Sequence, residues 1–386
     1  MTREYPSDPP PLTRVVFLID DLHRPNGIVS ATDLLATEMR RRGLDVDLWC
    51  FGPCDDDLRD RHHVVNPFPG RRLTSRMAGF ERSRQGLRPV RRVVGALWWP
   101  LVRVWMHCLA SSWDEGTMVI GAGLESTLLV AQAGVRPRIL VSQVHEDVSS
   151  LTPRQCDLVR QAAQVSRVLS VLTPSGIGAL AGWGLEAVCL VDPAPPLLGR
   201  ADPATSQTVV YLGRLARAKQ VDHLIEAFAA VAPAGWKLRI YGDGPARESL
   251  EAQARASGAD IALCGTVQDI GKVLRGAAIH ALPSRAEGLG MSVLEANMVG
   301  LPTVAYDCTA GIRMSAGPDA FLVPNGDRQA FQETLGSLMS DAEARARAGE
   351  LAFEYGQSFA APVVVNRWFA LWGMLNRPQG LGREQG

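Results

Sequence analysis

Two glutamates and two glycines stand close together in the stretch 284–302, SRAEGLGMSVLEANMVGLP. Gly288 and Gly290 permit a tight turn and the close approach of a ligand to the main chain. The helix expected directly after this turn offers free amide groups and the positive end of its dipole, which suit a phosphate group. Glu287 in the turn and Glu295 in the helix can accept hydrogen bonds from the hydroxyl groups of a sugar or a ribose. A glycine-turned helix with two solvated glutamates is the alternative interpretation.

Basic residues follow another predicted strand of the same half of the chain. The strand covers residues 208–212, Gly213 and Arg214 end it, and Lys219 comes soon after. Arginine offers a planar fork and lysine a point charge, a pair that suits a diphosphate. Because the carboxyl ends of parallel strands meet at one edge of a sheet, we expect these cations near Glu287. Solvated loop charges are the alternative.

Both groups of residues need a parallel sheet to bring them together. Residues 14–20 and 46–51 are apolar runs typical of buried strands, and residues 30–42 between them have helical spacing. This βαβ unit is the building block of a doubly wound sheet. The same alternation of strands and helices restarts after the proline-rich stretch 192–203, which is typical of a linker.

We therefore predict an α/β fold with two doubly wound, Rossmann-like domains that face each other across a cleft. The predicted divisions are an N-terminal, acceptor-side domain at 1–192, a C-terminal, nucleotide-sugar-binding domain at 204–358, and a closing helix at 359–386 that returns to the first domain.

Composition excludes several classes of protein. The 386 residues include 40 basic and 40 acidic residues, so the chain lacks the basic excess of a general nucleic-acid binder. Its seven cysteines form no CxxC pair, which argues against a zinc site of usual spacing and against a disulfide framework. No apolar stretch reaches the roughly 20 residues that span a bilayer, and the N-terminus lacks the apolar core of a signal peptide. We expect a cytoplasmic protein with reduced thiols.

The second half resembles the donor-binding domain of GT-B glycosyltransferases, specifically family 4. The two glutamates match that family's E-x7-E pattern, and the glycine–arginine strand end with its downstream lysine also matches. The blocks 306–311 and 321–327 look like members that act on polymer or lipid-linked acceptors. The resemblance is strong from about 208 to 330 and weak but compatible from 14 to 195.

The resemblance implies a role for each matched residue. Arg214 and Lys219 would hold the nucleoside diphosphate, Glu295 would bind the ribose, and Glu287 would sit beside the transferred sugar. His145, which follows a strand of the first domain, would lie close to the sugar as the second catalytic residue; a capping or core histidine is the alternative. The remaining donor-binding residues would be Gly27, Gly213, Gly265, Val267, Gly288, Leu289 and Gly290.

These roles imply a retaining glycosyltransferase that uses a nucleotide-sugar, with a UDP-sugar as the family default. Fixed cations and helix-start amides can stabilise the leaving diphosphate without a metal, and no Asp-x-Asp motif follows a suitable strand, so we expect no cofactor. The acceptor would be a hydroxyl group of a cell-envelope polymer, a lipid-linked sugar or a specialised metabolite. A sugar-nucleotide epimerase and a catalytically silent GT-B partner protein are the alternatives.

A basic, tryptophan-rich stretch remains outside this site. Arg71 to Arg103 contains nine arginines and one acidic residue, with Trp98, Trp99 and Trp105 within or just after it. Arginine meets lipid phosphate and tryptophan sits at the lipid–water interface, so peripheral contact with an anionic membrane, on the inner face of the cell membrane, is one interpretation. A solvated helix surface with core tryptophans is the other, and we expect Pro89, Gly95 and Pro100 to interrupt any long helix here.

Overall fold

The computed structural model describes residues 10–22, 27–67 and 88–377, with the main chain alone for 88–98. The chain divides into two compact units. The first unit comprises Met1–Val144, Val148–Leu190 and Val365–Gly386, and the second comprises His145–Asp147 and Val191–Val364. His145 was expected in the first domain, because it directly follows a strand of the first unit. Its contacts place it in the second unit.

The first unit contains a seven-stranded sheet in the order β3-β2-β1-β4-β5-β6-β7. Every neighbouring pair of these strands is parallel. The central strands are almost wholly buried apolar runs, as the sequence predicted. The strands are β1 (Arg14–Ile19), β2 (Asp45–Cys50), β3 (His63–Val65), β4 (Thr117–Gly121), β5 (Ile139–Val144), β6 (Val168–Val171) and β7 (Ala187–Cys189). The helices are α1 (Gly27–Arg41), α2 (Asp56–Arg61), α4 (Arg88–Ala110), α5 (Leu124–Gln132), α6 (Pro153–Val165) and α7 (Pro174–Ala181).

The second unit contains a six-stranded sheet in the order β10-β9-β8-β11-β12-β13, again parallel throughout. The strands are β8 (Thr208–Leu212), β9 (Lys237–Tyr241), β10 (Ile261–Gly265), β11 (Ile279–Leu282), β12 (Thr303–Asp307) and β13 (Phe321–Pro324). The helices are α8 (Val221–Val231), α9 (Arg247–Ser257), α10 (Ile270–Arg275), α11 (Met291–Met298), α12 (Ala310–Ala316), α13 (Arg328–Ser340), α14 (Ala342–Gly356) and α15 (Ala361–Leu375). Two doubly wound sheets confirm the predicted fold class.

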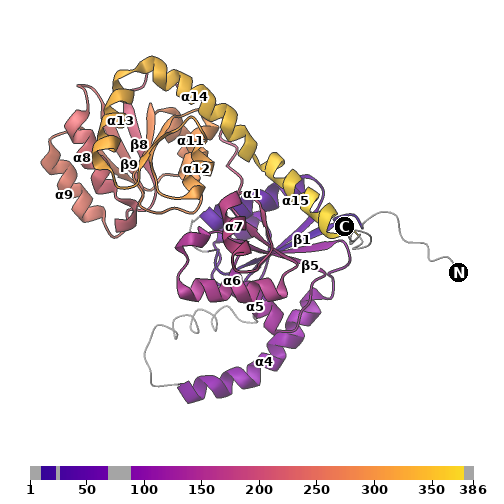
Figure 1. Ribbon diagram of the computed structural model, residues 1–386. Helices are drawn as coiled ribbons and strands as arrows, with labels where there is room; N and C mark the ends of the chain where they lie inside the picture. The colour runs from indigo at the N-terminus through magenta and orange to yellow at the C-terminus, as the bar shows by residue number, and fades with distance from the viewer. Residues whose placement is uncertain (1–9, 23–26, 68–87, 378–386) are drawn as a thin grey trace. The chain divides into compact units, whose positions relative to one another are not determined.

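Helices cover both faces of the second sheet because its strands are apolar on both sides. In Figure 1, α8, α9 and α13 lie on one side of β8 and β9, and α11 lies on the other. On the first side, the buried Tyr211 of β8 packs in one cluster with Phe228 of α8 and Phe331 of α13. On the other side, Val210 and Leu212 pack with residues of α10 and α11. Alternate residues of β8 thus enter opposite cores, which fixes the strand in the middle of the sheet.

Helix α15 crosses from the second unit to the first. From Val365 onward it belongs to the first unit, where the Trp372 indole donates a hydrogen bond to the Pro10 carbonyl at 3.0 Å. Arg42 of the first unit also donates to the side chain of Asn366. The closing helix is therefore tied to the strand-end and helix-end segments of the first unit.

Helix α4 corrects one expectation of the sequence analysis. It runs unbroken from Arg88 to Ala110 with Pro100 inside it, although three helix-breaking residues were expected to interrupt it. Pro89 lies in the first turn, where a missing amide hydrogen costs no intrahelical bond, and Pro100 removes only one such bond.

Within the described part of the chain, no helix has both the length and the hydropathy to cross a membrane.

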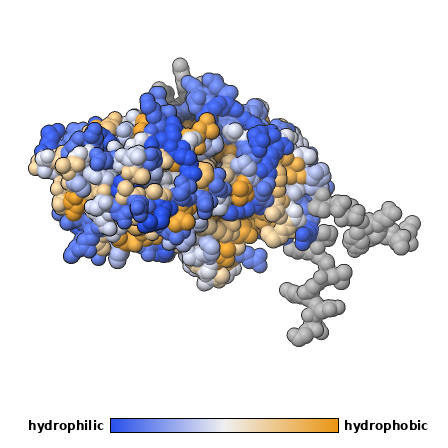
Figure 2. Space-filling view, turned by 90° about the horizontal axis from the view of Figure 1, so that it is seen from above, coloured by the Kyte–Doolittle hydropathy of each residue, from blue (hydrophilic) through white to orange (hydrophobic). Residues whose placement is uncertain are grey.

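Hydrophilic side chains cover most of the face shown in Figure 2, and hydrophobic residues appear there as small separate spots. Few large apolar side chains of the described residues are exposed. Three of these exposed side chains, Leu101, Val104 and Trp105, are neighbours on α4, with exposed fractions of 61%, 62% and 45%. These three side chains form an exposed apolar strip on α4.

Candidate functional site

Three neighbouring strands of the second unit each end at a glycine. The amide of Gly213, after β8, donates to the Tyr241 carbonyl at 3.1 Å, and the amide of Gly242, after β9, donates to the carbonyl of Gly265 at 2.7 Å. All three glycines have positive φ angles. A Cβ atom on Gly242 would overlap the Gly213 carbonyl oxygen, so this close approach of main chains requires glycine. The strand ends thus form a rim of main chain at the edge where ligands of such sheets bind.

The structure joins two of the predicted site residues in an ion pair. The Lys219 Nζ lies 2.6 Å from Glu287 Oε1, and the Ser284 hydroxyl donates to the same oxygen at 2.7 Å. Only 25% of the lysine side chain and 13% of the glutamate side chain are exposed. The Arg285 amide also donates to the Ala218 carbonyl at 3.0 Å, which ties the two loops together. The cation after β8 and the carboxylate after β11 therefore share one partly buried position, as the converging strand ends predicted.

Arg214 and Val267 lie on the same rim with different exposure. Arg214 is exposed, and its carbonyl accepts a hydrogen bond from the Tyr211 hydroxyl at 3.2 Å. Among the described residues, its guanidinium has no ion-pair partner. Val267 follows β10 and packs partly against the core cluster that includes α10 and α11. The arginine is thus available to an anionic ligand at the edge of the sheet.

The glycine turn before α11 is supported from behind by the start of α12. Gly290 caps α11 with a φ angle of 73°, and a Cβ atom there would lie 2.5 Å from the Ile312 side chain. A Cβ atom on Gly311 would overlap the Gly288 carbonyl oxygen. Leu289 between the two turn glycines is buried. The turn is therefore held in one conformation with the free amides of α11 at its end.

Glu295 of α11 has an unusual electrostatic environment. Burial raises the pKa of its carboxyl group to about 7, and no charged neighbour offsets this effect. Within the described residues, no hydrogen-bond donor contacts the carboxylate. A carboxyl group of this kind is ready to accept hydrogen bonds from ligand hydroxyl groups, and a perturbed pKa of this origin is typical of functional sites.

His145 forms a buried pair with an aspartate that the sequence analysis did not select. Its Nδ1 lies 3.3 Å from Asp192 Oδ2, and the two side chains are only 7% and 5% exposed. The His145 Nε2 and the Asp192 Oδ1 are buried and have no hydrogen-bond partner among the described residues. Burial lowers the pKa of His145, but the attraction and hydrogen bond of Asp192 outweigh that effect and leave the pKa raised. The only signal for Asp192 in the sequence was a carboxylate at the start of the proline-rich linker.

The His145 main chain also touches the glycine turn. A Cβ atom on Gly288 would lie 2.7 Å from the carbonyl oxygen of His145. The histidine, Asp192 and the turn that begins at Glu287 are therefore neighbours within the second unit. His145, Glu287 and Gly288 were selected from the sequence and Asp192 was not, and all four lie in one region.

One predicted donor-binding residue, Gly27, belongs to the first unit. Gly27 is the first residue of α1, and residues 23–26 before it lie outside the described part of the chain. At the end of β1, the Asp20 carboxylate accepts a hydrogen bond from the Ser126 amide at 2.7 Å and so caps α5. Burial raises the pKa of Asp20, against the effect of this hydrogen bond. Gly123 leaves the room for this carboxylate, because a Cβ atom there would overlap it.

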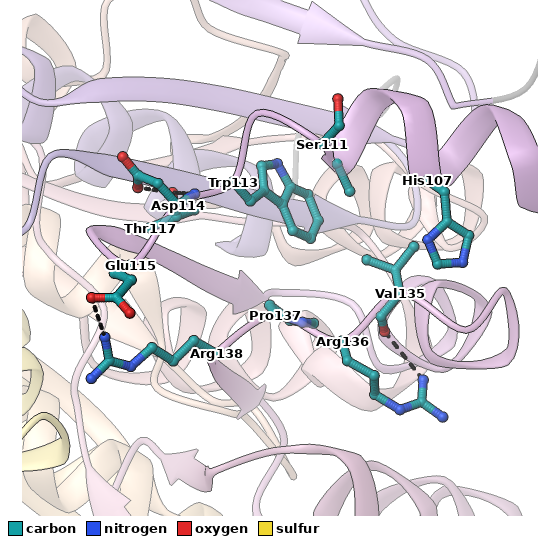
Figure 3. Close-up of a pocket in the computed structure, with 11 residues that line it drawn as sticks. His107, Ser111, Trp113, Asp114, Glu115, Thr117, Val135, Arg136, Pro137 and Arg138 are labelled. Atoms are coloured by element: carbon teal, nitrogen blue, oxygen red, sulfur yellow. Dashed lines mark hydrogen bonds and ion pairs between the residues drawn. The ribbon is translucent and has the colours of Figure 1, made fainter.

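A cavity in the first unit lies at the other edge of its sheet. It has a volume of about 510 Å³ and is lined by residues at the amino ends of β4 and β5, the edge opposite to the one where ligands of such sheets bind. In Figure 3, Arg138 points toward Glu115, whereas Arg136 points to the other side. The polar groups do not converge on one ligand position. The described residues also contain no group of three or more histidine, cysteine or acidic side chains placed to hold a metal ion.

Part of the chain is similar to a family of known proteins. Residues 206–341 match the family Glycosyl transferases group 1. The chain is 37% identical over 175 residues to an exopolysaccharide phosphotransferase of Streptomyces coelicolor, covering 44% of this chain and 19% of that protein. It is 26% identical over 164 residues to the amylovoran biosynthesis glycosyltransferase AmsD of Erwinia amylovora, covering 42% of this chain and 46% of the relative. The chain thus spans less than half the length of these relatives.

A solved structure matches most of the chain in fold. The Anabaena HepE protein, crystallised with UDP and glucose, superposes with a TM-score of 0.72 at 15% identity, covering 94% of this chain and all of that one. Gly213, Arg214, Lys219, Glu287 and Glu295 all lie within residues 206–341. Residues 206–341 are therefore similar to glycosyl transferases group 1, and the chain as a whole has the two-sheet fold of the HepE structure.

Proposed function

We propose that this protein is a retaining glycosyltransferase that moves a sugar from a UDP-sugar to a hydroxyl acceptor without a metal ion. The observation that carries the proposal is the arrangement of Lys219, Arg214, Glu287 and Glu295 at the strand ends of the group 1 domain. Cations for two phosphates and carboxylates for two sets of hydroxyl groups suit one ligand, a nucleoside diphosphate sugar.

Charge explains what these residues do in the reaction. The bond from the sugar C1 to the diphosphate oxygen breaks, a bond from C1 to the acceptor oxygen forms on the same face, and the acceptor proton goes to the departing phosphate. Arg214, Lys219 and the amides at the start of α11 stabilise the charge that develops on the diphosphate. Glu295 accepts hydrogen bonds from the ribose. Glu287, released from Lys219 when that lysine turns to the phosphates, accepts a hydrogen bond from the sugar.

The names of related proteins support a choice of substrates. The HepE structure contains UDP and glucose, which supports uridine as the base. The names of the exopolysaccharide and amylovoran relatives support a growing polysaccharide as the acceptor. All seven cysteines are free thiols, which supports action in the reducing cytoplasm.

A nucleotide-binding assay tests the proposal. The thermal shift caused by UDP and by a panel of UDP-sugars is measured for the wild type and for Arg214→Ala and Lys219→Ala. Both variants should lose the UDP-induced shift, because each removes a phosphate cation. Lys237→Ala is the matched control, since Lys237 is an exposed lysine at the opposite end of β9. Full UDP shifts in both site variants would contradict the proposed diphosphate site.

A second variant separates the sugar from the nucleotide. Glu287→Gln should keep UDP affinity within about twofold and reduce transfer or donor hydrolysis at least tenfold, because the amide keeps its shape but loses its charge. Unchanged turnover would contradict the role of Glu287 at the sugar. An altered configuration of the free UDP-sugar with no glycosylated product would instead identify an epimerase.

We also propose that α4 contacts an anionic membrane surface, here the inner face of the cell membrane. The supporting observation is the strip of Leu101, Val104 and Trp105, whose spacing of three and four residues places them on one helix face. Arginines precede this strip along the same helix. Vesicles with phosphatidylglycerol should sediment the wild type and leave Val104→Glu in solution, while Leu351→Glu, an exposed site on α14, should behave as wild type. Equal sedimentation of all three proteins would contradict this contact.

A further inference from the structure

We propose that Asp192 is a positioning residue that holds the Nδ1 hydrogen of His145 and so leaves Nε2 as the ring nitrogen that contacts the donor sugar. The inference rests on the proposed function, which supplies the sugar. It goes beyond that function by naming a residue outside the matched domain and the atom through which the histidine acts.

Other buried histidines in the described part of the chain show what a purely structural role looks like. His62 contacts Asp33 through Nε2 and Arg40 through Nδ1. His223 contacts a tyrosine hydroxyl through one nitrogen and a glutamine side chain through the other. In both rings each nitrogen has a hydrogen-bond partner within the protein, so neither ring needs a ligand to satisfy its polar atoms.

His280 is the useful intermediate case. Its Nδ1 lies 3.1 Å from the Thr303 hydroxyl, and its Nε2 has no partner. It sits in the fully buried strand β11, where burial lowers its pKa to about 3 and keeps the ring neutral. A neutral ring beside a hydroxyl in the core needs no ligand. His145 differs because its partner is a carboxylate, which is itself buried and incompletely bonded.

Two polar atoms of the buried pair have no hydrogen-bond partner in the part of the chain that the structure describes. These atoms are the His145 Nε2 and the Asp192 Oδ1, and each is shielded from solvent. Buried polar atoms in folded proteins almost always have partners, so two orphans in one pair call for a ligand group. The neighbouring segment is the turn at Gly288, which the proposed function places against the sugar and its phosphate.

The carboxylate decides which nitrogen is free. An imidazole that donates Nδ1–H to a carboxylate presents Nε2 as an acceptor when neutral and as a donor when protonated. Either form can bind a sugar hydroxyl, but only if the ring keeps this orientation. The charged groups that act on the ring are Asp192 and, more weakly, Glu146.

The first test uses the wild-type protein. Long-range ¹H–¹⁵N spectra of the full-length protein should show neutral His145 protonated at Nδ1. The ring signals should move on addition of the UDP-sugar that gives the largest thermal shift, and move much less with UDP alone. A ring protonated at Nε2, or equal responses to UDP and to the UDP-sugar, would overturn the inference without requiring any variant to fold.

The second test changes the carboxylate. Asp192→Asn should lower the pKa of His145 and reduce donor turnover about 10- to 100-fold, with UDP affinity unchanged. This loss is smaller than the roughly 10⁴-fold effect at the aspartate of a serine-protease triad, because His145 binds a hydroxyl group and does not take up its proton fully. Asp33→Asn is the matched control, since it alters another histidine–aspartate pair, and turnover should stay within twofold.

The outcomes separate this inference from the proposed function. Unchanged turnover in Asp192→Asn, or loss of UDP binding together with turnover, would overturn the positioning role. A further outcome is that Arg214→Ala and Lys219→Ala keep UDP binding while the His145 ring still responds to the sugar. That result would contradict the proposed diphosphate site and leave the positioning role of Asp192 supported.

Discussion

Gly311→Ala tests whether the turn at Gly288 forms part of the nucleotide site. Gly311 lies in the first turn of α12, and an added Cβ atom would lie 2.7 Å from the Gly288 carbonyl carbon and 3.2 Å from the Leu289 Cα, and would overlap the Gly288 oxygen. Ordinary contacts of a Cβ atom begin near 3.4 Å. The contact with the carbonyl carbon alone requires the helix and the turn to separate by 0.7 Å, and the overlap with the carbonyl oxygen requires more. Main-chain atoms on both sides leave no flexible side chain to yield.

The magnitude follows from two opposing effects. Overpacking of this kind costs about 1–3 kcal/mol of the free energy of unfolding, and the gain from alanine in a helix offsets at most about 1 kcal/mol. We expect a net destabilisation of about 1–2 kcal/mol. Because the displaced turn carries the amides proposed for the phosphates, UDP affinity should fall at least tenfold, which is about 1.4 kcal/mol.

Urea denaturation and titration calorimetry with UDP measure the two quantities separately. Gly373→Ala is the matched control, since Gly373 lies within α15 and a Cβ atom there meets nothing within 4 Å. The control should gain up to about 1 kcal/mol of stability and keep its UDP affinity. Wild-type UDP affinity in a folded Gly311→Ala protein would refute the assignment of the turn to the nucleotide site.

Three further predictions follow from single residues. Gln220 has a φ angle of 47°, so Gln220→Gly should raise the free energy of unfolding by up to about 1 kcal/mol, and a glycine variant less stable than Gln220→Ala in urea would contradict this. Burial raises the pKa of Glu295 to about 7, so the free energy of unfolding should fall as pH rises from about 5 to 7. UDP affinity should rise from pH 6 to 8, because the carboxylate forms in this range. Glu295→Gln should remove the glutamate contribution from both pH profiles. Arg345 is buried and donates to four main-chain carbonyls, so Arg345→Met should cost about 2–4 kcal/mol in denaturation, and a loss below 1 kcal/mol would contradict that role.

The fold could be predicted from sequence because its signals are local. Buried parallel strands such as β1 and β8 are continuous apolar runs, and each is followed by a helix of regular spacing. Helix α4 was the exception. Pro100 was expected to interrupt the helix, but the packing of Val102 and Met106 in the core of the first unit outweighs the hydrogen bond that the proline removes. Tertiary packing at this helix therefore overrides the low helix propensity of proline.

The site was predicted in part because some of its residues form motifs and others do not. Glu287 and Glu295 share one turn and helix, so their spacing was visible. The pairing of Lys219 with Glu287 joins residues far apart in sequence and depends on β8 and β11 being neighbours in the sheet. Asp192 had no motif at all, because only the fold brings it to His145.

The Lys219–Glu287 pair has a consequence for selectivity. Each charge of the pair already has its counterion within the protein. A simple anion such as inorganic phosphate must therefore break that ion pair, and it leaves the carboxylate without a counterion. A molecule that presents phosphate to one partner and a hydroxyl group to the other compensates both. Under the proposed function, the pair therefore acts as a filter that admits the whole sugar donor more readily than the abundant small anions of the cell.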